Sequence, residues 1–141
     1  MLCPSYENWE DEYADCLANT INDISKQQFA HIIFGGDLNI DFMNKHMTHT
    51  YSSVASSTED FAQSLQLKFV DNKIPPGSGY TFRLETAGAG SCADHFAVSD
   101  LLYDKIVAMS IIDRCLNISD HCAVSMDVCV PCQQEKSRII H

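Results

Sequence analysis

The chain has 141 residues, a hydrophobic fraction of 45% and a formal net charge of −10, which fits one small globular domain. No apolar run approaches the roughly 20 residues that cross a bilayer, and the first residues lack the pattern of a signal peptide, so we expect a nuclear or cytoplasmic location. The negative charge argues against tight, non-specific DNA binding by this chain alone, because Lys and Arg normally drive phosphate binding.

The first third of the chain predicts a helix, a strand and a loop. Apolar residues at helical spacing predict a helix from about Asn8 to Lys26, with an acidic and solvated opposite face. The apolar run from Phe29 to Phe34 predicts a buried strand that ends at Gly35 and Gly36. Residues 37–40 then form a loop at the carboxyl end of that strand, and the polar residues 43–57 predict a longer loop.

The remainder predicts one more helix and several short strands. Ser57 can cap a helix that runs to about Leu67, with Phe61 and Leu65 turned inward. Turns are expected at residues 72–79 and 88–90, and strands at residues 69–70, 80–85, 95–98, 106–112 and 122–130. Because the late strands follow one another without helices, the sheet should be mixed or antiparallel. One domain is expected over residues 1–132, followed by a polar tail at 133–141.

The seven cysteines do not predict a disulfide framework. Their number is odd, and most lie in apolar runs, so buried free thiols are expected at Cys92, Cys115, Cys122 and Cys129. Cys129 and Cys132 have CxxC spacing, but no second pair accompanies them, so a zinc site is not predicted there.

A carboxylate and a carboxamide follow the first predicted strand. Asp37 and Asn39 are two residues apart, so in an extended segment their side chains point the same way. The carboxylate could orient an attacking water or accept its proton, while the carboxamide could donate a hydrogen bond to a phosphoryl oxygen. The alternative is an Asx-turn, in which both side chains satisfy local backbone donors.

A second polar segment, Ser119-Asp120-His121, precedes the last predicted strand. Asp120 could bind Mg²⁺, and His121 could donate to a phosphate or transfer a proton. Asp94, if it lies close, could hold the imidazole by its other nitrogen. The alternative is a turn with a satisfied polar pair. His95 adjoins an apolar strand and is expected to pack in the core with its ring nitrogens satisfied.

Taken in order, these motifs resemble the endonuclease/exonuclease/phosphatase family, and most of all the endonuclease domains of LINE-type (non-LTR) retrotransposons. The motifs are Gly35-Gly36-Asp37-Leu38-Asn39, Tyr80-Thr81-Phe82, Asp94-His95 within residues 91–99, and Ser119-Asp120-His121. The resemblance implies an α/β (α+β) fold class, namely the later part of a two-sheet mixed α/β sandwich. It also implies Mg²⁺-dependent (alternatively Mn²⁺-dependent) cleavage of phosphodiester bonds, with DNA or another phosphate ester as the partner.

The resemblance assigns a role to each polar residue. Asp37 would activate the attacking water with support from Asn39, and His121, oriented by Asp94, would contact the scissile phosphate. The metal would be bound by Asp120, and the substrate would be bound by Thr81 and Ser119. The family domain begins with a strand that carries an active-site Asn and a strand that ends in a metal-binding Glu, and this sequence begins after both.

That departure implies weak or no activity for the isolated chain, and an exposed apolar face or sheet edge. The alternatives are a non-catalytic remnant that acts as a binding module, and a small-molecule or lipid phosphatase of the same family.

Overall fold

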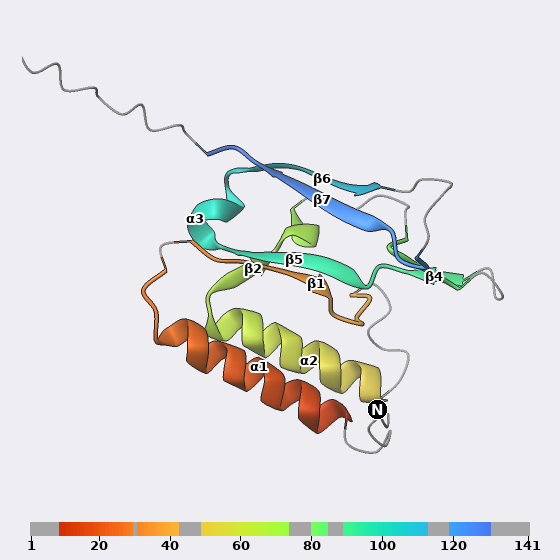
Figure 1. The fold of residues 1–141 in the computed structure, drawn as a ribbon, viewed down its shortest axis with the longest axis horizontal. Helices are drawn as coiled ribbons and strands as arrows, with labels where there is room; N and C mark the ends of the chain where they lie inside the picture. The colour runs from red at the N-terminus through yellow and green to blue at the C-terminus, as the bar shows by residue number, and fades with distance from the viewer. Residues whose placement is uncertain are drawn as a thin grey trace, which may run out of the picture.

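In the computed structural model the chain folds into three layers, which are a pair of helices, a central sheet and a second sheet (Figure 1). The structure describes residues 9–29, 31–42, 49–73, 80–84, 89–112 and 119–130. The helices cover one face of the central sheet, and the second sheet lies across its other face. The expected mixed α/β class is therefore confirmed.

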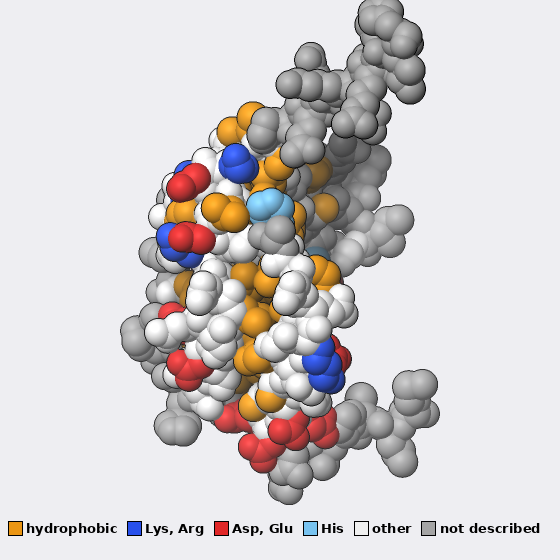
Figure 2. All heavy atoms as spheres, turned by 90° about the vertical axis from the view of Figure 1, so that its left-hand side faces the viewer, with side chains coloured by type: hydrophobic (Ala, Val, Ile, Leu, Met, Phe, Trp, Pro, Cys, Tyr) orange, Lys and Arg blue, Asp and Glu red, His pale blue; other side chains and the backbone are white. Residues whose placement is uncertain are grey.

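The helical layer consists of α1 (Trp9–Ser25) and α2 (His49–Ser64), which pack side by side. Tyr13 of α1 and Thr58 of α2 share a hydrogen bond of 2.7 Å between their hydroxyl groups. Hydrophobic side chains form a stripe between the two helices, and acidic side chains gather beneath α1 (Figure 2). The predicted first helix and its solvated acidic face are thus confirmed.

The central sheet has the strand order β1 (Ile33–Asp37), β5 (Asp94–Ser99), β2 (Leu67–Phe69), and both pairs are antiparallel. The register of β1 and β5 sets Asp37 directly opposite Asp94 at one end of the ladder. Opposite residues in an antiparallel pair have neighbouring side chains on the same face, so this register brings two carboxylates together.

Two smaller sheets complete the structure. β6 (Ile106–Ile112) pairs with β7 (Ala123–Val128), and β3 (Phe82–Leu84) pairs with β4 (Ala89–Ser91), both antiparallel. An isolated bridge joins Phe82 to His121, just before β7. The short helices are η1 (Val70–Asn72) and α3 (Asp100–Tyr103), which follow β2 and β5.

Two apolar clusters hold the layers together. The first lies between the helices and the central sheet and includes Leu17, Ile40, Phe61 and Ala97. The second lies between the central sheet and the β6–β7 pair and is formed by Val70, Val98, Leu102, Ile106 and Met109. Burial of this apolar surface is the main favourable term in folding, so each face of β5 is anchored by its own cluster.

Several predicted boundaries are wrong. The second helix ends at Ser64 rather than near Leu67, and the strand predicted at residues 69–70 is Leu67–Phe69, with Val70 in η1. The loop predicted over residues 43–57 ends by His49, where α2 begins, because Val54, Ala55, Phe61 and Ala62 form one buried helical face. The polar residues of α2 are compatible with a helix, since the hydroxyl of Thr58 donates back to the carbonyl of Val54 at 2.8 Å.

The strand that was predicted as buried and as ending at Gly35 differs in both respects. β1 continues through both glycines to Asp37 because β5 pairs with it along that whole length. It also lies at the edge of the described sheet, and Ile33 is 54% exposed. Similarly, Gly90 was expected in a turn but belongs to β4, and Cys129 is exposed rather than buried.

The predictions for Cys115, Cys132, residues 74–79 and the tail from 131 onward lie outside the described residues. Within the described part of the chain, no helix combines the length and the apolar character needed to cross a bilayer.

Candidate active site

Asp37 ends β1 and caps a tight turn. The backbone N–H of Asn39 donates to Oδ1 of Asp37 at 2.9 Å, and Asn39 has a φ of 54°. Asn tolerates this left-handed conformation better than most residues do. The segment is therefore the Asx-turn that the sequence offered beside the extended geometry, and the side chains of Asp37 and Asn39 do not follow an extended segment. The turn holds one carboxylate oxygen of Asp37 and leaves Oδ2 facing His121.

His121 lies between Asp37 and Asp94, the two carboxylates that the register of β1 and β5 sets opposite each other. Its Nδ1 donates to Oδ2 of Asp94 at 2.9 Å, and its Nε2 lies 3.7 Å from Oδ2 of Asp37. All three side chains are partly exposed, at 31% for His121, 19% for Asp94 and 38% for Asp37. The pairing of His121 with Asp94, which the sequence analysis expected, is present.

These surroundings favour the charged form of the imidazole. The hydrogen bond that His121 donates to Asp94 raises the pKa of His121, and the negative charges of Asp94, Asp37 and Asp120 add to that effect and outweigh partial burial. The contact of 3.7 Å between Nε2 and Asp37 is too long for a hydrogen bond. A protonated His121 therefore keeps its Nε2–H available for a ligand.

Thr81 is fully buried and connects the segments that carry Asp94 and His121. Its hydroxyl accepts hydrogen bonds from the backbone N–H groups of Ala93 and Asp94, at 2.8 and 3.1 Å. Its carbonyl accepts a third from the N–H of Cys122 at 2.7 Å. The sequence analysis assigned Thr81 to substrate binding, but the structure places its hydroxyl inside the protein. From there it positions the backbone of Asp94.

Ser119 and Asp120 are exposed at the rim of the site. The hydroxyl of Ser119 donates to Oδ1 of Asp120 at 3.3 Å and accepts from the N–H of His121 at 3.1 Å. The carbonyl of Asp120 accepts from the N–H of Arg83 at 3.0 Å, which ties this segment to β3. Asp120 contributes to the raised pKa of His121, but it is outside the tight group of Asp37, Asp94 and His121.

A surface hollow of about 440 Å³ opens beside this group, lined in part by Gly35, Gly36, Phe96 and Val124. The absence of a side chain at Gly35 is a packing requirement, because a Cβ there would lie 2.4 Å from the ring of Phe96. Gly36 adopts a φ of 148°, which side-chain-bearing residues rarely adopt. The glycines thus let the backbone form one wall of the hollow.

The oxygen donors of the site fit a hard divalent cation. Asp37, Asp94 and His121 each offer a ligand atom, and these atoms lie within 4.8 Å of one another. Nδ1 of His121 is already engaged by Asp94, and Mg²⁺ prefers oxygen ligands. The carboxylates of Asp37 and Asp94 are therefore the groups of this cluster that could hold such an ion.

A second polar group lies nearby, and the sequence analysis missed one of its members. His95 is 3% exposed; its Nδ1 lies 3.0 Å from Oδ1 of Asp71, and its Nε2 donates to the carbonyl of Ile40 at 2.6 Å. The expectation of a satisfied core histidine is confirmed. Asp71 carried no signal in the sequence, because a single Asp after a short strand is common in turns.

Comparison with known proteins gives a likeness in structure alone. No protein-family model matches the chain, and no curated protein matches it. A 3′-5′ exonuclease (NExo) from Neisseria meningitidis matches with a TM-score of 0.70 and 18% identity, over 89% of this chain and 55% of that one. An AP endonuclease from Archaeoglobus fulgidus matches with a TM-score of 0.69 and 20% identity, over 86% of this chain and 55% of that one. The chain has the fold of these enzymes.

The AP endonuclease LMAP from Leishmania major also matches, with a TM-score of 0.64 and 17% identity, over 89% of this chain and 44% of that one. The chain thus spans about half the length of the solved structures it resembles. The fold class predicted from the sequence, part of an endonuclease/exonuclease/phosphatase-type sandwich, is confirmed. Asp37, Asp94 and His121 lie together at one end of the central sheet of this fold.

Proposed function

We propose that this chain belongs to a divalent-metal-dependent phosphodiesterase that nicks DNA, of the kind carried by LINE-type retrotransposons. The observation that carries the proposal is the His121 imidazole, held by Asp94 on one side and facing Asp37 on the other. A cationic donor beside a second carboxylate suits an anionic phosphate ester attacked by water. The fold of the solved DNA-processing enzymes supports the same class of reaction.

Each residue then has a distinct task in the reaction. Nε2–H of His121 donates to a non-bridging phosphoryl oxygen and stabilises the negative charge that grows there. Asp94 keeps the imidazole protonated and fixes the ring in place. Oδ2 of Asp37 accepts the proton from the attacking water, while the Asx-turn through Asn39 holds that carboxylate in position. Ser119 supports the segment of His121 and lies at the rim, where a substrate would approach.

Asp120, the metal ligand that the resemblance implies, would bind Mg²⁺ or Mn²⁺ together with water and the phosphate of the substrate, which leaves Asp37 to accept the proton of the attacking water. Such an ion would neutralise charge on the phosphate and on the leaving oxygen. We expect low activity from the chain by itself, because these residues supply only part of the ligand set that the resemblance implies.

A smaller phosphate ester is the second candidate substrate, and the net charge of −10 favours it. Such a chain repels a long polyanion, whereas a small phosphomonoester or a lipid head group carries fewer charges and meets less electrostatic repulsion. The same groups would serve either substrate, because both present phosphoryl oxygens to His121. A non-catalytic binding module is the remaining alternative.

The test is nicking of supercoiled plasmid by the purified chain in Mg²⁺, beside the hydrolysis of bis-p-nitrophenyl phosphate and p-nitrophenyl phosphate. We expect slow nicking that EDTA abolishes and that His121→Asn lowers at least 100-fold. His31→Asn is the matched control, because His31 is exposed at the start of the β1 segment and lies outside the site. Hydrolysis of the monoester alone would favour the smaller substrate. A folded chain that cleaves none of the three would favour the binding module.

A further inference from the structure

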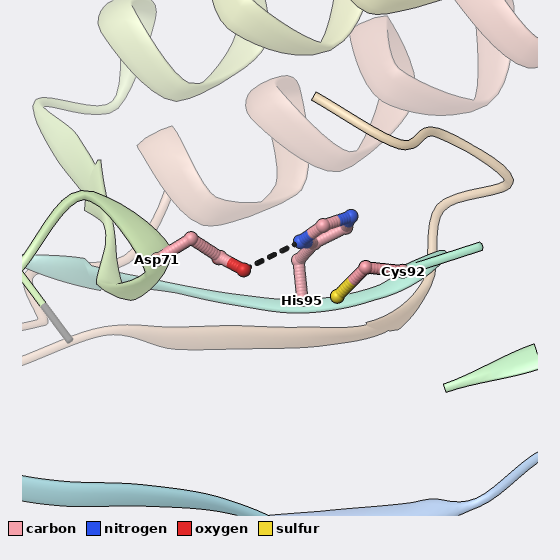
Figure 3. A group of neighbouring side chains, drawn as sticks. All are labelled: Asp71, Cys92 and His95. Atoms are coloured by element: carbon pink, nitrogen blue, oxygen red, sulfur yellow. Dashed lines mark hydrogen bonds and ion pairs between the residues drawn. The ribbon is translucent and has the colours of Figure 1, made fainter. Parts of the chain in front are cut away.

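Asp71, Cys92 and His95 form a second group of metal-ligating side chains on the other side of β5. Their ligand atoms, a carboxylate oxygen, a sulfur and an imidazole nitrogen, lie within 4.8 Å of one another. Asp71 comes from η1, Cys92 lies two residues before the start of β5, and His95 lies within β5 (Figure 3). Successive strand residues point to opposite faces, so His95 points away from the face that carries Asp94. The group is therefore separate from the candidate active site.

The imidazole of His95 is oriented as a metal ligand would be. Its Nε2–H donates to the carbonyl of Ile40 at 2.6 Å, which directs Nδ1 toward Asp71. Histidines that bind metals typically donate their other N–H to a carbonyl or a carboxylate in this way. The rings of Phe42 and Phe69 lie against the imidazole and restrict its rotation.

Asp71 supplies a second, independent observation. Its Oδ1 faces Nδ1 of His95, while its Oδ2 is buried and has no hydrogen-bond partner among the described residues. A buried carboxylate oxygen without a donor is costly, and such groups are uncommon in native structures. A cation bound by Nδ1 of His95 would give Oδ2 of Asp71 a partner, and the sulfur of Cys92 lies near the same two side chains (Figure 3).

We propose that Asp71, Cys92 and His95 bind a zinc ion, with water as the fourth ligand. The combination of sulfur, nitrogen and oxygen donors suits Zn²⁺ and is unsuited to Mg²⁺, which takes oxygen ligands. Tetrahedral zinc with bonds of about 2.0–2.3 Å brings its donors to within about 3.3–3.8 Å of each other. Nδ1 of His95 and Oδ1 of Asp71 lie 3.0 Å apart and must separate slightly, while any ligand atoms farther apart than this range, up to 4.8 Å, must draw together. The ion would tie η1 to β5 directly behind Asp94.

Cobalt substitution tests the site without any measurement of catalysis. The full chain, first treated with a chelator, is titrated with Co²⁺ and followed by absorbance. We expect one equivalent to bind, with a thiolate-to-cobalt charge-transfer band in the near ultraviolet that Zn²⁺ then abolishes. Zn²⁺ should also raise the Tm of the chain, because an ion that binds the folded state alone stabilises it.

Cysteine variants decide which thiol is the ligand. Cys92→Ser should remove the band, while Cys122→Ser, which alters a buried thiol outside the group, and Cys129→Ser, which alters the CxxC pair, should keep it. If Cys92→Ser is unfolded by circular dichroism, Asp71→Asn provides the second test and should weaken Co²⁺ binding at least 10-fold. No Co²⁺ binding, a band that survives in Cys92→Ser, or a band lost in Cys129→Ser would overturn the proposal.

Discussion

At the scale of single residues, Asp94 governs the charge of His121. Because the hydrogen bond that His121 donates to Asp94 is the largest cause of the raised pKa of His121, Asp94→Asn should bring that pKa back toward its ordinary value. The imidazolium is lost as pH rises through the pKa, so the falling limb of any nicking activity should move to lower pH in the variant. NMR titration of the His121 ring protons measures the shift directly.

Asp100→Asn is the control for that titration, because Asp100 is exposed beyond the opposite end of β5 and pairs with Lys68. The variant should leave the pKa of His121 unchanged. An Asp94→Asn variant with an unshifted His121 would show that the hydrogen bond does not set the charge state.

A substitution of the buried Thr81 tests whether its hydroxyl positions Asp94. Thr81→Val keeps the shape but removes the acceptor for the N–H groups of Ala93 and Asp94, and leaving them unpaired should cost about 1–3 kcal/mol in the free energy of unfolding. It should also lower the pKa of His121, because Asp94 loses its fixed backbone. Thr81→Ser should restore both quantities in urea unfolding and NMR titration. A loss of stability with an unchanged His121 pKa would make Thr81 purely structural.

The sequence predicted site residues well where the order of the motifs and the chemistry of the site together limit which side chains can act as partners. Asp94 and His121 were paired in advance because an imidazole near a phosphate needs an orienting carboxylate. The turn at Asn39 could not be selected, since a positive φ and an extended φ are both open to Asn in a loop. Asp71 was missed because its partner, His95, is 24 residues away, and only the folded sheet brings them together.

At the scale of elements, β1 depends on a close approach to β5. A methyl group at Gly35 would meet the ring of Phe96 at 2.4 Å, so Gly35→Ala should destabilise the chain by about 1–3 kcal/mol through overpacking. Phe96→Leu should recover part of this loss, because it removes the ring that the methyl group strikes. Urea unfolding of the two single variants and the double variant measures the coupling.

Gly36→Ala is the control for the double-mutant cycle of Gly35→Ala and Phe96→Leu. Its Cβ meets nothing within 4 Å, and any loss arises from the φ of 148° instead. Phe96→Leu should therefore leave the cost of Gly36→Ala unchanged. Equal rescue of both glycine variants would argue against a steric origin at Gly35.

Helix α1 and strands β5, β6 and β7 were predicted well because each has a clear apolar period. Strand β1 was expected to be buried because its run of apolar residues resembles an interior strand. Burial depends on neighbours that a local pattern does not encode, and Ile33 is 54% exposed. In α2, Ser and Thr weaken the helical signal, and only the packing of Phe61 and Val54 against the first cluster fixes the start of the helix.

At the scale of the whole molecule, the net charge of −10 predicts an unusual response to salt. A protein with 6–10 phosphate contacts loses about 10³–10⁵ in DNA affinity between 50 and 200 mM salt. This chain should bind DNA weakly in EDTA, with an affinity that is flat or rises with salt as repulsion is screened. Fluorescence anisotropy of a labelled duplex measures this dependence, and a steep loss of affinity with salt would show that local basic groups outweigh the net charge.

The candidate active site depends on three separate hydrogen-bonded sheets rather than on one. Asp37 and Asp94 belong to the central sheet, Phe82 of the β3–β4 pair bridges to His121, and His121 leads into β7. Among the described residues, β3 is joined to the segment before β7 by a single bridge, in which the N–H of Cys122 donates to Thr81 and that of Arg83 donates to Asp120. This short connection can open while both apolar clusters stay intact. On warming, the chain should therefore lose its activity several degrees below the temperature at which circular dichroism reports loss of its secondary structure, because the connection at Thr81 opens before the two apolar clusters do.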